Sequence, residues 1–334
     1  MTARRDTVGI VGAGAFGTGL GSVLARAGRR VVLWSRDPAI VETIRTTRRC
    51  PRLPGAELPE PLEATADPRR LAGEARFVIL AVTSTNVRAR ARELGDVLDG
   101  SHIVVHAIGA LAAPDNQRVS QVMEQGLPTL KIGAIAGPAL PDDLAESKYS
   151  SIVVASAFDE VVAEGRRLLN APPVLRVYGS RDLVGVELAS ALSGAFTIAL
   201  GLSDGLGVGP GTRAVLLTRA LAEASRLGAA AGADPRTFSG LAGLGNLLVR
   251  ATDRSDDYRL GRRLAEARRG DAARTDARPE ALTEGARATL AGAELAAQLK
   301  VRVPVLQGLA AVLTGRAEPA QVANLIGDSV AEAE

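Results

Sequence analysis

Short apolar runs separated by polar segments make up most of the first 180 residues. The runs are rich in valine and isoleucine and only a few residues long, which is typical of strands buried on both faces of a parallel sheet. The predicted strands are residues 8–11, 31–34, 77–82, 103–105, 132–136, 152–155 and 174–178. The proline- and glycine-rich stretch 51–61 is interpreted as a loop.

From residue 182 onward the apolar positions recur with helical spacing and the β-branched runs disappear. Helices are predicted over 182–203, 213–231, 238–251, 257–268, 282–299 and 305–314. A chain of 334 residues is long enough for two domains. The pattern therefore predicts an α/β domain over residues 1–180 and an all-α domain over residues 181–334, with a substrate cleft between them.

A glycine-rich segment, Gly12-Ala13-Gly14-Ala15-Phe16-Gly17, lies between the first predicted strand and a helix over residues 18–27. In that context the first glycine makes a tight turn and the second lets backbone N–H groups approach a pyrophosphate. The third lets the helix pack closely on the strand. A glycine-rich turn alone is a weak signal, but a second strand follows one helix later. The segment predicts a Rossmann-type dinucleotide-binding domain, with Gly12, Gly14, Ala15, Phe16 and Gly17 contacting the cofactor.

Cofactor choice depends on the residues after the second strand. A carboxylate there favours the ribose 2′-OH of NAD, whereas an arginine favours the 2′-phosphate of NADP. The chain has Ser35, Arg36 and Asp37, and Asp37 comes slightly late for the carboxylate role. We therefore expect NADP or NAD with a slight preference for NADP, although a solvated Arg36 is an equally simple interpretation.

Composition excludes several other classes of protein. The net charge is only +3, and one tryptophan, three tyrosines and five phenylalanines do not alternate with basic residues, so nucleic-acid binding is not expected. A single cysteine and two histidines offer neither an internal disulfide nor a metal cluster. The apolar stretch 183–202 is long enough to span a membrane but contains Glu187 and lacks flanking anchors, so a buried core helix is expected. No signal peptide is apparent, and a cytoplasmic location is the default expectation.

Several motifs resemble the NAD(P)-dependent glycerol-3-phosphate dehydrogenase family over nearly the whole chain. The longest are GLSDGLG at 201–207 and GLAGLG at 240–245. Further matching segments are 12–18, 32–36, 53–55, 137–138, 177–178, 182, 185–188, 218–219, 237–238, 284–285 and 304. The resemblance implies hydride transfer between a nicotinamide cofactor and dihydroxyacetone phosphate, a homodimer, and a cofactor contact from Glu284.

The positions that carry chemistry in this family are replaced here. The family has a lysine where Ile108 precedes Gly109, a Lys-Asn pair at Ser193-Gly194, and an aspartate at Asn246. The resemblance places the catalytic positions at Ser193 and Asn246, with His106 as a candidate acid or base. It places the substrate-binding positions at Arg250, Ser255, Asp256, Asp257 and Arg259, where the family has a threonine at 250 and Arg-Asn at 256–257.

The losses are coordinated, because a buried lysine and its aspartate partner are absent together. Available cations are Arg213, Arg250 and Arg259, of which the latter two are as readily explained as solvated side chains. His106 is likewise explained as a hydrogen-bonded strand-end residue. Two functions remain open: an oxidoreductase acting on a dihydroxyacetone-phosphate-like or different small hydroxy or keto substrate, and a catalytically silent nucleotide-binding protein.

Overall fold

The computed structural model describes residues 6–266 and 282–320, and the chain divides into two compact units. One comprises Met1–Ile108 with Gln117–Leu183, and the other comprises Gly109–Asn116 with Val184–Glu334. The sequence places a single boundary after residue 180. The observed boundary lies three residues later, after Leu183. In addition, Gly109–Asn116 belongs to the second unit, because Ala110 packs in a buried cluster with Ala191 and Ala288.

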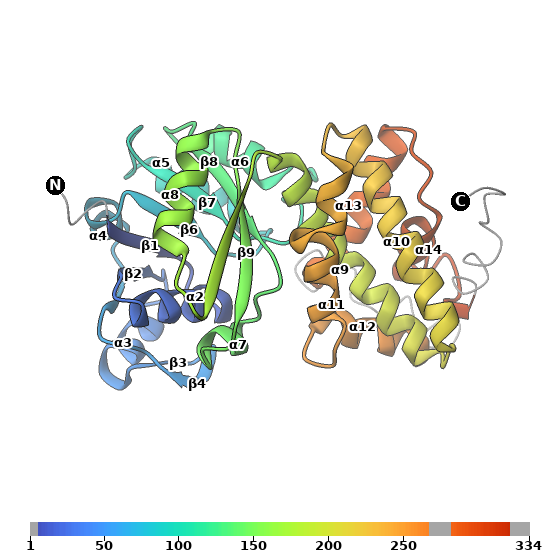
Figure 1. The fold of residues 1–334 in the computed structure, drawn as a ribbon, viewed down its shortest axis with the longest axis horizontal. Coiled ribbons are helices and arrows are strands. Elements are labelled where there is room, and N and C mark those ends of the chain that lie inside the picture. The colour runs from blue at the N-terminus through green and yellow to red at the C-terminus, as the bar shows by residue number, and fades with distance from the viewer. Residues whose placement is uncertain (1–5, 267–281, 321–334) are drawn as a thin grey trace. The chain divides into compact units, whose positions relative to one another are not determined.

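The first unit is built on an eight-stranded sheet in the order β10-β9-β8-β7-β6-β1-β2-β5 (Figure 1). Its strands are β1 (Thr7–Val11), β2 (Arg30–Trp34), β5 (Leu62–Thr65), β6 (Phe77–Leu80), β7 (Ile103–His106), β8 (Ile132–Ala136), β9 (Ser150–Ala155) and β10 (Leu175–Ser180). Neighbours run parallel except β8 and β9. Val11 lies beside both Trp34 and Leu80, so the carboxyl ends of β1, β2 and β6 meet at one edge.

The interpretation of residues 51–61 as a loop is wrong in part. A two-stranded antiparallel ribbon forms there from β3 (Arg49–Cys50) and β4 (Leu53–Glu57), followed by β5 at the sheet edge. Leu53 and Ala56 are buried in β4 while Pro54 and Gly55 are exposed. Proline and glycine are tolerated because β4 pairs on one side only and their positions face solvent.

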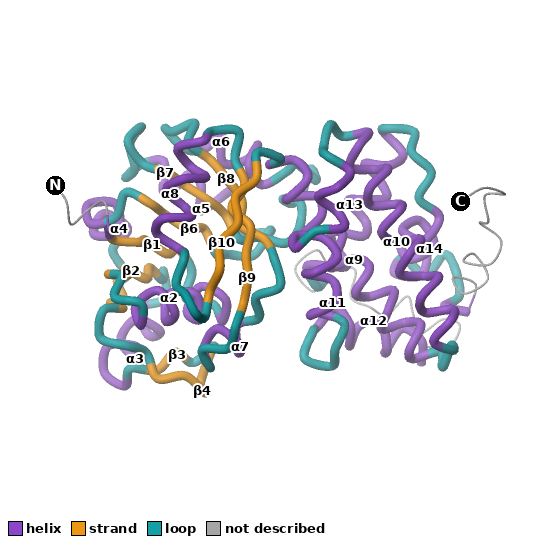
Figure 2. Tube along the Cα trace, viewed as in Figure 1, coloured by secondary structure: helices purple, strands orange, loops and turns teal. Residues whose placement is uncertain are grey.

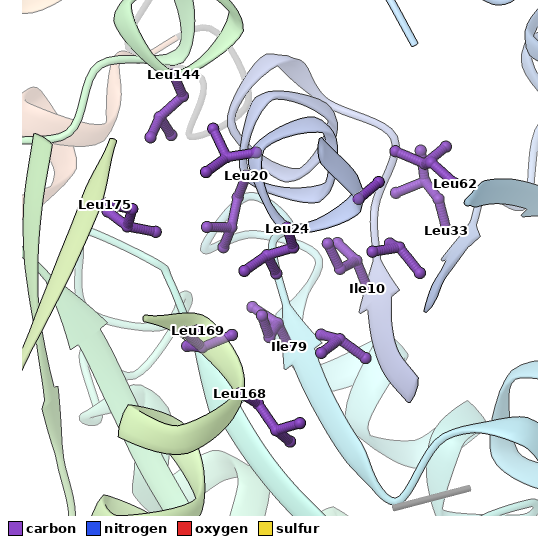
Figure 3. Close-up of a cluster of buried hydrophobic side chains, with 14 of the residues drawn as sticks. Ile10, Leu20, Leu24, Leu33, Leu62, Ile79, Leu144, Leu168, Leu169 and Leu175 are labelled. Atoms are coloured by element: carbon purple, nitrogen blue, oxygen red, sulfur yellow. The ribbon is translucent and has the colours of Figure 1, made fainter. Parts of the chain in front are cut away.

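The helices of this unit among the described residues are α2 (Ala15–Arg26), α3 (Pro38–Thr47), α4 (Pro68–Glu74), α5 (Val87–Gly95), α6 (Val119–Gly126), α7 (Pro141–Ala145) and α8 (Asp159–Leu169) (Figure 2). Leu20 and Leu24 of α2 are fully buried and lie over Ile10 and Ile79 of the sheet (Figure 3). Burial of each of these leucine side chains contributes roughly 1.5–3 kcal/mol to the stability of the fold. Their packing fixes the beginning of α2 against the end of β1.

The second unit is helical and contains α9 (Leu183–Gly205), α10 (Pro210–Ala230), α11 (Asn246–Arg250), α12 (Asp256–Glu266), α13 (Glu284–Gln298) and α14 (Pro304–Leu313). Among the described residues α9 alone is long and apolar enough to cross a membrane, and 89% of its apolar window is buried inside the molecule. That burial fits the predicted core helix. The fold class predicted from the sequence, a Rossmann-type domain followed by an all-α domain, is confirmed.

The single helix predicted over 238–251 is wrong. The structure has a 3-10 turn at Pro235–Ser239, a π-helical turn at Leu241–Gly245, and then the short α11. A β-carbon on Gly243 would lie 2.1 Å from the carbonyl oxygen of Phe238. The backbone widens here, because the N–H of Gly245 donates to the carbonyl oxygen of Gly240 at 3.0 Å, five residues back. Such π-helical turns are frequent at functional sites.

Candidate functional site

The three glycines of the loop between β1 and α2 have different surroundings. Gly12 has a φ of +113°, and a β-carbon there would lie 2.3 Å from the carbonyl oxygen of Ala81. A β-carbon on Gly17 would lie 2.4 Å from the carbonyl oxygen of Gly12, whereas one on Gly14 would meet nothing within 4 Å. The first and third glycines therefore permit the turn and the close packing, and the second leaves space open above the loop.

A cavity of about 450 Å³ lies in the first unit at the carboxyl ends of β1, β2 and β6. All the cofactor-binding residues predicted from the loop and from the end of β2 line it: Gly12, Gly14, Ala15, Phe16, Gly17, Ser35 and Arg36. In the described part of the chain no side chain caps α2, whose first turn faces this space. Its unpaired N–H groups and the open side of Gly14 fit a pyrophosphate, so a dinucleotide fits the site.

The charge around the cavity is mainly positive. Arg36, Arg52 and Arg90 line it together with a single acidic residue, Asp37. The Asp37 carboxylate caps α3, where its Oδ1 accepts a hydrogen bond of 3.0 Å from the backbone N–H of Ala39. That bond holds the carboxylate at the helix terminus.

The predicted catalytic residues Ser193 and Asn246 meet in the second unit. Asn246 donates from Nδ2 to Ser193 Oγ at 2.8 Å, and the Ser193 hydroxyl donates to the carbonyl oxygen of Ser190 at 2.7 Å. Both residues are buried, with 3% and 8% of their surfaces exposed. The hydroxyl proton of Ser193 is therefore committed to the backbone of α9.

Arg250 and Asp257 form an ion pair beside that cluster. Arg250 Nη2 lies 2.7 Å from Asp257 Oδ2, and Asp257 Oδ1 accepts a hydrogen bond of 3.0 Å from the backbone N–H of Gly285. β-carbons on Gly109 and Gly194 would each lie 3.5 Å from the Arg250 guanidinium. The arginine thus lies against two side-chain-free positions and is held there by a carboxylate that is 4% exposed.

The other candidate cations of this unit are paired with carboxylates as well. Arg259 contacts Asp256, Arg213 lies 3.2 Å from Asp204, and Arg262 lies 3.2 Å from Asp253. The Asp256 side chain is 79% exposed, and Ser255 Oγ accepts a bond of 3.5 Å from the N–H of Tyr258. A hydrogen bond of 2.6 Å joins the Tyr258 hydroxyl to Asp204, and burial followed by this carboxylate raises the pKa of Tyr258 to about 12.

The remaining candidates lie elsewhere. His106 ends β7 with 1% of its surface exposed, and its Nδ1 accepts a bond of 3.3 Å from the N–H of Ile108, which is also buried. Neither lines the cavity described in the first unit. Glu284, predicted as a cofactor contact, begins α13 in the helical unit and pairs with Arg287 at 2.6 Å.

Two arginines of the cavity, Arg52 and Arg90, were not predicted. Arg52 stands 16 positions after Arg36, in the stretch interpreted as a loop. Arg90 stands 54 positions after Arg36, on α5, the helix after β6. Only the strand order, which places β6 next to β1, brings α5 to this edge. The pairing of Arg250 with Asp257 had a signal in the sequence, because both positions depart from the resembled family in complementary charge.

Comparisons with known proteins agree with this geometry. Family models described as the N-terminus and the C-terminus of NAD-dependent glycerol-3-phosphate dehydrogenase match residues 7–162 and 182–324. A glycerol-3-phosphate dehydrogenase (NAD(P)+) of Geobacter metallireducens is 35% identical over 313 residues, which cover 92% of each chain. Another, from Azotobacter vinelandii, is 36% identical and covers 92% of this chain and 90% of its own.

Among solved structures, a glycerol-3-phosphate dehydrogenase from Coxiella burnetii superposes with a TM-score of 0.86 at 27% identity. The match covers 96% of this chain and 98% of that one. The likeness therefore extends over both units.

Proposed function

This chain belongs to the NAD-dependent glycerol-3-phosphate dehydrogenase family, and from that premise we propose a hydride transfer between NAD(P)H and a small keto compound, performed with substituted catalytic residues. It is an NAD(P)-dependent oxidoreductase acting on CH–OH groups. The observation that carries the proposal is the cavity over Gly12–Gly17, which gathers every cofactor residue predicted in the first unit.

A bound nicotinamide supplies the hydride, and the residues of the first unit hold the cofactor. The open side of Gly14 would admit a pyrophosphate to the N–H groups of α2, and Arg36 would be available to the adenosine ribose. The helical unit supplies the substrate contacts. We place them at Arg250 and Asp257, beside Ser193 and Asn246.

A phosphate dianion is poorly matched to that part of the helical unit. Each arginine predicted as a replacement cation already has a carboxylate partner, so the Arg250–Asp257 pair carries no net charge. A charge-assisted hydrogen bond contributes roughly 1.5–3 kcal/mol, and losing two or three costs on the order of 5 kcal/mol in binding. We therefore propose that reduction of dihydroxyacetone phosphate is absent or very slow, and that a ketone without a phosphate is the better substrate.

Polarisation of the substrate oxygen falls to Arg250. In the described part of the chain only Nη2 of its guanidinium has a hydrogen-bond partner, which leaves Nε and Nη1 as donors for a carbonyl oxygen. Arginine stays protonated at neutral pH, so it stabilises developing negative charge without giving up a proton. The Ser193 proton is engaged by the carbonyl oxygen of Ser190, so Ser193 does not supply the proton that the substrate oxygen takes up.

The test is a steady-state assay of NADPH and NADH oxidation with dihydroxyacetone phosphate and with a panel of unphosphorylated ketones and 2-oxo acids. We expect turnover with a member of the panel and little with the phosphate ester. Turnover of dihydroxyacetone phosphate in the ordinary range of about 1–10³ s⁻¹ would contradict the substitution proposal. Dinucleotide binding without turnover on any substrate would favour the second candidate, a catalytically silent nucleotide-binding protein.

A double variant, Ser193→Lys with Asn246→Asp, tests whether the family chemistry belongs at this place. We expect it to gain activity on dihydroxyacetone phosphate. Ser203→Lys is the matched control, because Ser203 is 5% exposed on the same helix and its hydroxyl donates to Leu200 O in the same way. Equal gains in both variants would show that any buried lysine on α9 suffices and that the site is placed wrongly.

We also propose a homodimer, from the family resemblance, and keep the default expectation of a cytoplasmic location. Sedimentation of the purified protein tests the oligomeric state, and fractionation of the producing cell tests the location. A monomer at micromolar concentration would contradict the proposed homodimer.

A further inference from the structure

We propose that Arg90 on α5 acts with Arg36 as the binding group for the 2′-phosphate of NADP(H), an inference that rests on the dinucleotide binding proposed above. The two arginines line the same cavity from different elements, Arg36 just after β2 and Arg90 in the helix that follows β6. Two guanidinium groups converging on one point are a common arrangement for a phosphate dianion.

Arg90 is held in place by its neighbours. Its guanidinium carbon lies 5.7 Å from the centre of the Trp34 ring, and its Nη1 contacts the carboxylate of Glu93. Trp34 is itself fixed, because its ring N–H donates to the carbonyl oxygen of Ala66 at 3.1 Å. Among the residues that the structure describes, the Trp34 ring and Glu93 are the partners of this guanidinium, so its other donors are available at the cavity.

The same edge presents three arginines, Arg36, Arg52 and Arg90, against one carboxylate. The acidic residue of the cavity lining, Asp37, is engaged at the N-terminus of α3. Ser35 Oγ accepts a bond of 3.2 Å from the N–H of Asp37, which orients this turn further. Positive charge therefore exceeds negative charge in the cavity lining, and a 2′-phosphate is a better complement to it than a 2′-OH.

The arginines also repel each other when no anion lies between them. Burial first, and then the positive charge of Arg36, lower the pKa of Arg90 from its ordinary value. A dianion placed between the two groups removes that repulsion. The phosphate therefore gains more binding free energy from the two arginines together than from each alone. The effects of the two substitutions on NADPH affinity should not be additive.

Trp34 is the only tryptophan of the chain and lines the cavity, so its fluorescence reports binding directly. The experiment titrates NADPH, NADH, adenosine 2′,5′-bisphosphate and 5′-AMP into the wild-type protein and into Arg90→Ala, Arg36→Ala and the double variant. Calorimetry repeats each titration, because removing Arg90 alters the surroundings of Trp34. Arg92→Ala is the matched control, since Arg92 is exposed on the same helix.

We expect Arg90→Ala to weaken NADPH and the bisphosphate about tenfold or more, and NADH and 5′-AMP by less than about threefold. Arg90→Lys should restore part of the NADPH affinity, and Arg92→Ala should leave all four ligands unchanged. The double variant should lose less than the product of the two single losses.

Equal losses for NADPH and NADH in Arg90→Ala would overturn the proposal and assign Arg90 to stacking on the adenine ring, which both cofactors share. Unchanged affinities would overturn it as well. A wild-type protein that binds neither dinucleotide would contradict the proposed function itself. The two failures can be told apart, because a wrong assignment of Arg90 alone leaves a wild-type protein that still binds NADH.

Discussion

At the residue scale, the glycine loop separates a requirement of the fold from a requirement of the ligand. Gly12 and Gly17 lie against backbone carbonyl oxygens at distances that admit no side chain, so their replacement would disturb β1 and α2. Gly14 has open space above it in the cavity. Only Gly14 therefore offers a substitution that blocks the ligand without displacing the chain.

We predict that Gly14→Val weakens binding of either dinucleotide by about tenfold or more, because the side chain occupies the place of the pyrophosphate and removes charge-assisted contacts. Its melting temperature should stay close to that of the wild type. Gly73→Val is the control, since Gly73 of α4 also has nothing within 4 Å of a β-carbon and lies outside the cavity. Tight binding by Gly14→Val in calorimetry would place the nucleotide elsewhere.

The two neighbouring aspartates of α12 provide a second contrast at this scale. Asp257 is 4% exposed and binds both Arg250 and the N–H of Gly285, whereas Asp256 is 79% exposed and contacts Arg259. We predict that Asp257→Asn lowers the free energy of unfolding by roughly 2–4 kcal/mol, because Arg250 loses its counter-charge in a partly buried position. Asp256→Asn should cost less than about 1 kcal/mol. Urea unfolding of both variants decides, and equal losses would contradict this account of the Arg250 site.

At the element scale, a carboxylate from one helix caps the beginning of another. Glu223 of α10 is 2% exposed and accepts hydrogen bonds from the backbone N–H groups of Val305 and Leu306, at 2.8 and 3.1 Å. Burial raises the pKa of Glu223 to about 7, against the opposing effects of these bonds and of Arg226 and Arg302. The carboxyl group of the folded protein therefore ionises at a higher pH than that of the unfolded chain.

This shift has a definite sign. Between about pH 4.5 and 7 the unfolded chain loses the Glu223 proton first, so the contribution of Glu223 to stability is complete below that window and is lost as the pH rises through it. We predict a loss of roughly 3 kcal/mol from this group. Unfolding of the wild type and of Glu223→Gln at pH 4.5 and 8 measures it, because other groups cancel in the difference. Parallel pH profiles of the two proteins would be inconsistent with the prediction.

The elements themselves were predicted unevenly. Every strand expected from an apolar run in the first unit has a counterpart in the sheet, because burial on both faces imposes a continuous apolar sequence. β3, β4 and β5 were missed since they are short, lie at edges and contain or follow proline and glycine. The break at Leu241–Gly245 was missed since its residues keep helical apolar spacing, while the packing of the Phe238 ring against Gly228 of α10 is a tertiary contact.

At the scale of the whole molecule, the chain passes from the first unit to the second and back before residue 184. Ala110, Leu111 and Ala112 belong to the helical unit and are 3%, 5% and 0% exposed. We predict that a fragment of residues 1–183 self-associates, because this apolar segment loses its partners. The same fragment with residues 109–116 replaced by an equally long Gly/Ser linker should be monomeric and should still bind NADPH. Sedimentation and the Trp34 titration test both statements, and two monomeric fragments would refute the first.

The sequence by itself determined the two fold classes, the positions of the main strands along the chain and the position of the glycine loop. These follow from local spacing: apolar runs require burial, and the three glycines meet steric demands within a few residues of one another. The substrate contacts that we propose also come from position along the chain.

Only the tertiary structure decided which charges meet. Parallel strand order brings Arg90 to the cavity of Arg36 across 54 positions, and the packing of α11, α12 and α13 joins Arg250, Asp257 and Gly285. Whether a buried arginine is a free cation or half of a neutral pair depends on the partner within about 4 Å, and no local pattern records that distance. The substrate and the cofactor preference that we propose rest on those pairings.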